Sequence, residues 1–149
     1  MQVWLRIGPW AHGECRNGGF PDWLTEEFGS RLRSNDPGYL KEVRRLYQKI
    51  GEQAAGEMAK DGGPIIGIQL ENEYGHCGGG PSSQEECMEH MRTLKRMALE
   101  AGMEVPYYTS TGWGGGRRNT SGAGRLCGCA LGGACSGNAR QRQLFIFVL

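Results

Sequence analysis

The sequence lacks any apolar run of the roughly 20 residues that a membrane-spanning helix needs. The apolar stretch at its C-terminal end, residues 144–149, is too short for that purpose. The sequence also contains no signal-peptide pattern and no internal repeat. We therefore expect neither a membrane partner nor a repeat architecture.

Acidic residues are absent from residues 115–149, which contain five Arg, eight Gly, three Cys and no Lys. All 16 acidic residues lie in residues 1–114, with 12 of the 17 basic ones, so that part is net negative. A negative domain argues against nucleic acid as its partner. Two domains are predicted: residues 1–114, and a Gly/Arg/Cys-rich tail, 115–149, that is disordered or translated out of frame.

Two functional alternatives for the tail are weaker. Cys127 and Cys129 could bind a soft metal, but no second ligand pair of the kind that zinc sites use is evident. The Arg-rich stretch lacks the interleaved aromatic residues of a nucleic-acid-binding segment. Before the tail, Cys15, Cys77 and Cys87 form no convincing disulfide framework, which favours a reducing compartment such as the cytoplasm.

The part before the tail reads as a β-α-β-α-β series. Strands are predicted at residues 3–7, 65–70 and 105–110, and helices at residues 37–59 and 83–101. Asp36 is a candidate N-cap with Pro37 at the first helical position, and Ser82 or Ser83 begins a capping-box pattern for the second helix. This order predicts an α/β fold with a parallel sheet.

The strand at residues 65–70 ends in two carboxylates that flank an amide, Glu71, Asn72 and Glu73. A carboxylate at the mouth of a buried strand loses water on one side, which raises its pKa and lets it hold a proton near neutrality. The amide can orient a polyol. The pattern fits the acid/base of a glycosidase. The alternative is a pair of surface Glu residues in a loop.

A second strand end leads into a glycine-rich loop at residues 8–24. This loop contains Trp10, His12, Glu14 and Asn17. An aromatic face together with a carboxylate and an amide suits a sugar, which has apolar C–H patches and many hydroxyls. Each residue also has a structural alternative, since Trp10 could be a packing anchor and His12 a buried structural histidine.

Four motifs occur in an order and spacing that resemble the catalytic domain of glycoside hydrolase family 35. They are RIGPW at residues 6–10, GGFPDWL at 18–24, RSNDP at 33–37 and GGPIIGIQLENEYG at 62–75. The resemblance covers residues 1 to about 114. It implies a (β/α)₈ barrel and a retaining β-galactosidase that acts on β-galactosides without a metal or cofactor.

The resemblance also implies roles for particular residues. Glu73 corresponds to the general acid/base, and Asn72 contacts the sugar next to the cleaved bond. Glu14 holds galactose hydroxyls, while His12 and Gly13 line the same pocket. Two departures, Trp10 where the family more often has Tyr and His12 where it has another residue, bear on substrate preference.

The length of 149 residues is short of the roughly 250 that such a barrel needs. The resemblance implies a partial barrel, about strands three to five with two intervening helices. Met1 falls at a strand edge, so any signal peptide would lie upstream. No segment matches the family's nucleophile. Glu71, which a regular strand would place on the same side as Glu73, is the only local rival. The isolated chain is therefore expected to be inactive. The alternatives are a non-catalytic carbohydrate-binding remnant and a non-functional truncated product.

Overall fold

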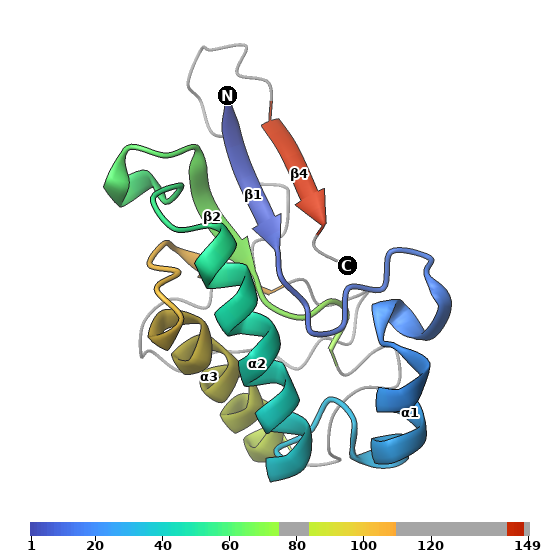
Figure 1. The fold of residues 1–149 in the computed structure, drawn as a ribbon. Coiled ribbons are helices and arrows are strands. Elements are labelled where there is room, and N and C mark those ends of the chain that lie inside the picture. Colours follow the sequence, from blue (N-terminus) through green and yellow to red (C-terminus); the bar gives the residue numbers. More distant parts are fainter. Residues whose placement is uncertain (75–83, 110–142, 148–149) are drawn as a thin grey trace.

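The computed structural model describes residues 1–74, 84–109 and 143–147. Its centre is a four-stranded parallel sheet in the order β3-β2-β1-β4 (Figure 1). The strands are β1 (Gln2–Arg6), β2 (Ile65–Gln69), β3 (Tyr107–Tyr108) and β4 (Gln143–Phe147). The predicted α/β class with a parallel sheet is confirmed.

Strand β4 comes from the tail, for which no regular element was expected. It pairs parallel with β1, and Leu5 lies opposite Ile146 in this register. On the other side of β1, Leu5 lies opposite Ile68 of β2. Strand β1 is therefore an interior strand of the sheet, paired on both edges.

Helices α2 (Pro37–Gln53) and α3 (Gln84–Glu100) lie side by side against the sheet (Figure 1). The predicted N-cap of α2 is confirmed, because the Asp36 side chain accepts a hydrogen bond from the Tyr39 N–H at 3.0 Å. The capping box predicted for α3 involves Ser82 and Ser83, which lie outside the described residues. No helix of the described part is long and apolar enough to cross a membrane.

The predicted extent of the first long helix, residues 37–59, is wrong at its end. Helix α2 stops at Gln53, and Gly56 takes a left-handed φ of 81°. The chain then turns so that Met58 forms a parallel β-bridge with Ile65, ahead of the short 3₁₀ helix η3 (Ala59–Asp61). Met58 is buried as the apolar spacing indicated, although it lies outside the helix.

A further helix, α1 (Asp22–Phe28), was not predicted. Glycines and Pro21 dominate the preceding segment, and they indicated a loop that continued to residue 24. Short 3₁₀ helices, η1 (Arg16–Gly19) and η2 (Gly29–Arg31), flank α1. This unit leads the chain from the end of β1 to Asp36, where α2 begins.

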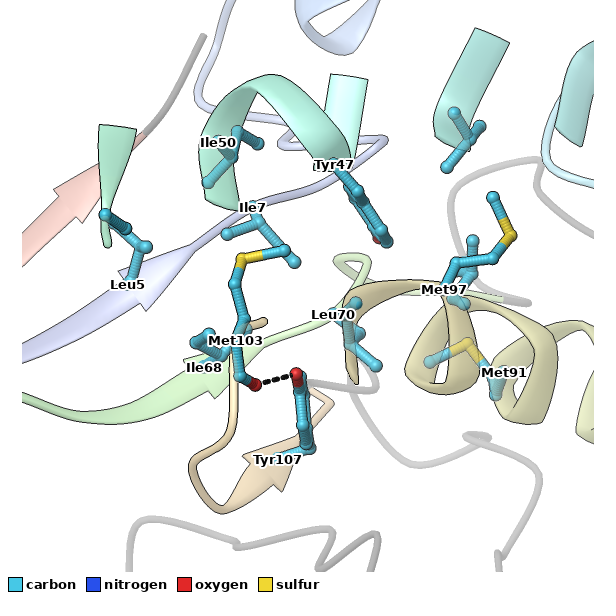
Figure 2. Close-up of a cluster of buried hydrophobic side chains, with 14 of the residues drawn as sticks. Leu5, Ile7, Tyr47, Ile50, Ile68, Leu70, Met91, Met97, Met103 and Tyr107 are labelled. Atoms are coloured by element: carbon cyan, nitrogen blue, oxygen red, sulfur yellow. Dashed lines mark hydrogen bonds between the residues drawn. The ribbon is translucent and has the colours of Figure 1, made fainter. Parts of the chain in front are cut away.

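The hydrophobic core lies between the sheet and helices α2 and α3 (Figure 2). Fully burying a large apolar side chain contributes about 1.5–3 kcal/mol. The core members labelled in Figure 2 are Leu5, Ile7, Tyr47, Ile50, Ile68, Leu70, Met91, Met97, Met103 and Tyr107. Ile7 directly follows β1, and Leu70 directly follows β2. Because both are buried in the core, the core fixes the two strand ends that lead into the polar residues described below.

Candidate functional site

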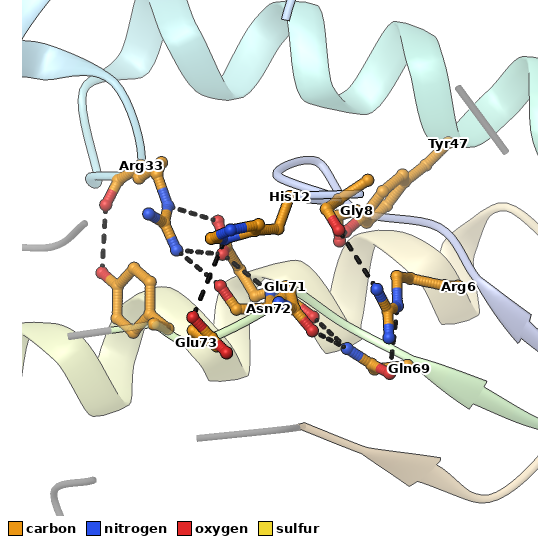
Figure 3. A network of polar contacts seen from close by, with 11 residues as sticks. Arg6, Gly8, His12, Arg33, Tyr47, Gln69, Glu71, Asn72 and Glu73 are labelled. Carbon is orange, nitrogen blue, oxygen red and sulfur yellow. Dashed lines mark hydrogen bonds and ion pairs between the residues drawn. The ribbon is translucent and has the colours of Figure 1, made fainter. Parts of the chain in front are cut away.

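The carboxyl ends of β1 and β2 are bonded to each other through their backbones. Ile7 N–H donates to the Gln69 carbonyl at 3.2 Å, and Glu71 N–H donates to the Gly8 carbonyl at 2.8 Å. The Tyr47 hydroxyl also donates to the Gly8 carbonyl, at 2.9 Å. These bonds bring the loop after β1 next to the turn after β2 (Figure 3). The two segments singled out in the sequence therefore meet at one edge of the sheet.

The turn after β2 is not a regular continuation of the strand. Glu71 and Glu73 both take left-handed backbone conformations, with φ of 56° and 50°. Such a conformation costs a non-glycine residue about 1–3 kcal/mol and persists only where surrounding contacts enforce it. The expectation that a two-residue period would place Glu71 and Glu73 on the same side is wrong. Glu71 is fully buried, whereas the side chain of Glu73 is 30% exposed.

Glu71 is held by a buried ion pair with Arg33. The guanidinium donates to both carboxylate oxygens, from Nε at 3.2 Å and from Nη2 at 2.7 Å. The same Nη2 donates to the Asn72 carbonyl at 2.9 Å, and Asn72 N–H donates to Glu71 at 3.1 Å. Burial raises the pKa of Glu71, and the positive charge of Arg33 opposes that rise. Every one of these contacts to Glu71 is a donated N–H, so each contact favours the carboxylate and opposes the effect of burial.

Arg33 also connects the site to two aromatic rings. Its guanidinium carbon lies 4.6 Å from the ring centre of Trp10 and 5.6 Å from that of Tyr74. The Tyr74 hydroxyl donates to the Arg33 carbonyl at 3.0 Å. Trp10 thus packs against a buried cation, as the anchoring alternative indicated. Cation–π contacts of this kind contribute about 2 kcal/mol or more where they are desolvated.

A second set of contacts orients the Asn72 side chain. Arg6 Nε donates to Gln69 Oε1 at 3.2 Å. Gln69 Nε2 donates to the Glu71 carbonyl at 2.8 Å and to Asn72 Oδ1 at 2.9 Å. Both the backbone and the side chain of Asn72 are thereby fixed beside Glu73.

Glu73 stands at the open end of this network and faces His12. The His12 Nδ1 and a Glu73 carboxylate oxygen are 3.7 Å apart, and the two side chains are 40% and 30% exposed (Figure 3). His12 also takes a left-handed backbone conformation, with φ of 63°. The structure thus brings together three of the predicted site residues, His12, Asn72 and Glu73, and leaves the carboxylate of Glu73 reachable by a ligand.

The other predicted residues of the loop lie at its surface. Gly13 and Glu14 are exposed, and among the described residues the Glu14 carboxylate takes part in no hydrogen bond or ion pair. Asn17 donates to Asp22 at 2.8 Å, which ties the loop to the start of α1. Glu14 is therefore free to contact a ligand.

Sequence reasoning missed the roles of Arg33, Gln69 and Arg6. Arg33 lies in the RSNDP motif, and Gln69 lies in the strand that leads to the carboxylates. A charged residue inside a short apolar strand, such as Arg6, is itself a signal, because charges are rarely buried without partners. Within the described residues, no group of three or more His, Cys, Asp or Glu side chains could hold a metal ion.

In α/β barrels, active sites lie at the carboxyl ends of the parallel strands. This chain carries a carboxylate and an amide, Glu73 and Asn72, at that edge of its sheet. The model of glycosyl hydrolases family 35 matches residues 1–130. The chain belongs to this family. The family implies a TIM-barrel catalytic domain, and the sheet and its two long helices are consistent with part of such a barrel.

Individual relatives agree with the family match. The chain is 37% identical over 113 residues to "Beta-galactosidase 8" of Oryza sativa subsp. japonica. This alignment covers 75% of this chain and 16% of the relative. It is 35% identical over 121 residues to "Probable beta-galactosidase A" of Neosartorya fischeri. This alignment covers 80% of this chain and 12% of the relative. It is 34% identical over 113 residues to "Beta-galactosidase" of Xanthomonas manihotis. This alignment covers 75% of this chain and 18% of the relative. The chain spans less than a fifth of the length of these relatives.

Proposed function

We propose that this chain is a segment of the catalytic barrel of a retaining β-galactosidase. The segment would comprise about strands three to five, with α2 and α3 between them. The observation that carries the proposal is the contrast between two neighbouring carboxylates. Glu71 is buried in an ion pair, and Glu73 is partly exposed at the carboxyl edge of the sheet, 3.7 Å from His12.

In the proposed reaction, Glu73 is the general acid/base. It protonates the glycosidic oxygen as the galactosyl group is transferred to a nucleophilic carboxylate, and then deprotonates the water that hydrolyses the galactosyl-enzyme. Asn72 contacts the sugar beside the cleaved bond. Glu14 holds galactose hydroxyls, and His12 and Gly13 line the same pocket. The exposure of Glu14 and the position of the half-buried His12, 3.7 Å from Glu73, support these roles.

The nucleophile of the proposed reaction is not Glu71. Retaining enzymes need two carboxyl groups about 5–5.5 Å apart on opposite faces of the sugar. Glu71 is completely buried, and both of its oxygens accept hydrogen bonds from Arg33. A carboxylate that is paired in this way cannot reach the anomeric carbon. We infer that another part of the parent enzyme supplies the nucleophile and that this chain alone is inactive.

The test is Glu73→Gln in the full-length parent enzyme. General acid–base catalysis typically contributes about 10²–10⁴-fold, so kcat/KM for a galactosyl disaccharide should fall by that factor. An aryl β-galactoside with a strongly activated leaving group needs little protonation and should lose less in the glycosylation step. Glu26→Gln, the same change at an exposed position, is the matched control. Equal, near-normal turnover of both substrates by Glu73→Gln would show that the assignment is wrong.

A further inference from the structure

The side chains of Arg6, Gln69 and Asn72 form a chain of hydrogen bonds that ends beside Glu73 (Figure 3). We propose that Arg6 and Gln69 are positioning residues that hold the Asn72 amide with its NH₂ group toward the substrate. In that orientation Asn72 donates a hydrogen bond to the sugar hydroxyl next to the cleaved bond. This inference rests on the proposed function and deepens it, because it assigns a direction to the contact between Asn72 and the sugar.

The first constraint on the direction comes from Arg6. A guanidinium has only donors, so the Gln69 atom that faces it must be the acceptor, Oε1. The distance from Arg6 Nε to Gln69 Oε1 is 3.2 Å. Arg6 is itself fixed, because its Nη1 donates to the Ala11 carbonyl at 3.2 Å. Gln69 therefore presents its NH₂ group on the side away from Arg6.

The second constraint comes from the backbone of the turn. The carbonyl of Glu71 can only accept, and it lies 2.8 Å from Gln69 Nε2. A reversed Gln69 amide would place its oxygen against this carbonyl and its NH₂ group against Arg6. Both contacts would then be repulsive. Two partners with fixed roles, one at each end of the amide, thus determine the orientation of Gln69.

The orientation of Gln69 in turn determines that of Asn72. Gln69 Nε2 lies 2.9 Å from the Asn72 side chain, and a donor there requires the acceptor Oδ1. The Asn72 backbone is held as well, since its N–H donates to Glu71 and its carbonyl accepts from Arg33. Among the described residues, Asn72 Nδ2 makes no hydrogen bond to the protein. The free group of Asn72 is therefore a donor.

A donor at this place suits the reaction. Hydrogen bonds to the 2-hydroxyl of the sugar strengthen in the transition state of glycoside hydrolysis. In the proposed complex, the amide of Asn72, which directly precedes the acid/base, faces the hydroxyl that neighbours the anomeric carbon. An asparagine that could turn over would also present its carbonyl, which accepts a hydrogen bond from a hydroxyl and cannot donate one.

The test compares an aryl β-galactoside with its 2-deoxy analogue in the full-length enzyme. The readout is kcat/KM for the aryl β-galactoside divided by kcat/KM for the 2-deoxy analogue. This ratio does not depend on the amount of folded enzyme. Asn72→Ala should lower this ratio by at least about tenfold, because it removes the hydrogen bond to the 2-hydroxyl. Arg6→Met and Gln69→Met should lower the ratio in the same direction, since each frees the Asn72 amide to turn.

Two further variants serve as controls. Arg6→Lys retains a group that can only donate, so it should keep the ratio close to that of the wild type. Arg45→Met makes the same change as Arg6→Met at an exposed position and should leave the ratio unchanged. The charge of Arg6 also acts on Glu73, but that effect is common to both substrates and cancels in the ratio.

An unchanged ratio in both Arg6→Met and Gln69→Met, together with a lowered ratio in Asn72→Ala, would overturn the inference and leave the proposed function standing. An unchanged ratio in Asn72→Ala would also overturn it, because Asn72 would then not bond the 2-hydroxyl. Failure of the proposed function itself is seen separately, in normal turnover of unactivated galactosides by Glu73→Gln.

Discussion

The guanidinium of Arg33 binds both carboxylate oxygens of Glu71, and the two side chains are 4% and 0% exposed. The pair joins the segment before α2 to the turn after β2. Because Arg33 also contacts the Asn72 carbonyl, it holds the backbone on which Glu73 is carried. The pair thus acts on the site through the shape of the turn.

Arg33→Met should destabilise the catalytic domain by about 3–5 kcal/mol, because it leaves the Glu71 carboxylate buried without a partner. The double variant Arg33→Met, Glu71→Leu should recover part of the loss. Thermal unfolding of the full-length enzyme provides the measurement. Arg31→Met is the control. Its ion pair with Asp36 is exposed, and such pairs contribute about 0–1 kcal/mol. Equal effects of Arg33→Met and Arg31→Met would contradict the importance of burial.

His90 should make stability depend on pH. Burial lowers the pKa of His90 to about 4, and the charge of Arg33 adds to this effect. The ring stacks against Tyr39 and Tyr74, and its Nδ1 lies 3.2 Å from Asn35 Oδ1. Between the ordinary pKa of 6.5 and the folded value, the unfolded chain binds a proton that the folded chain does not. The free energy of unfolding should therefore fall by up to about 3 kcal/mol as pH is lowered through this range.

The measurement for His90 is the melting temperature at pH 7 and at pH 5, for the wild type and for His90→Gln. The variant should lose less stability between the two pH values than the wild type does. An identical loss in both proteins would show that other groups cause the acid sensitivity.

Glu14→Ala should separate binding from stability. The side chain is exposed and forms no ion pair within the described residues, so its removal should change the free energy of unfolding by less than about 0.5 kcal/mol. If Glu14 accepts galactose hydroxyls, kcat/KM should nevertheless fall strongly. Melting temperature and kinetics of the full-length variant give the two values. A variant that unfolds readily but binds galactose normally would identify Glu14 as structural.

The 149-residue chain made alone should not hydrolyse β-galactosides, since Glu71 is paired with Arg33 and cannot act as the nucleophile. The measurement is a fluorogenic β-galactoside assay on the purified chain, with Glu73→Gln as the control. Sustained turnover that disappears in Glu73→Gln would contradict this prediction. It would require an oligomer that completes the barrel, or release of Glu71 from Arg33.

Gly18→Ala should disturb the site through Trp10. A Cβ at this glycine would lie 2.4 Å from three indole carbons, at a φ of 61°. The ring would have to leave the position in which it contacts Arg33, and such overpacking typically costs about 1–3 kcal/mol. Gly62→Ala is the matched control, because Gly62 also has a positive φ but has open space around it. The melting temperature of Gly18→Ala should be lower than that of Gly62→Ala. Equal values would show that the indole moves without cost.

Several features could be predicted from local sequence. The apolar run before Glu71 predicted β2, and Asp36 with Pro37 predicted the start of α2, where the Asp36 side chain caps the helix. The order of four motifs pointed to family 35, and the family match bears this out. These features depend on residues close together in the chain, so the sequence records them directly.

Other features depend on contacts that no local pattern records. The end of α2 moved from residue 59 to Gln53 because Met58 pairs with Ile65 of the sheet. Helix α1 went unpredicted because the glycines and proline before it indicated a loop. At the end of α2, a tertiary contact outweighed the apolar spacing.

The sequence by itself determined which family this chain belongs to and which side chains follow each strand. Only the tertiary structure decided that Glu71 and Glu73 take different environments. A regular strand would have placed them alike, but Arg33, 38 positions before Glu71 in the chain, binds Glu71 in the interior. Buried charges need a partner, and the turn adopts left-handed conformations to provide one. That same turn leaves Glu73 at the surface beside His12.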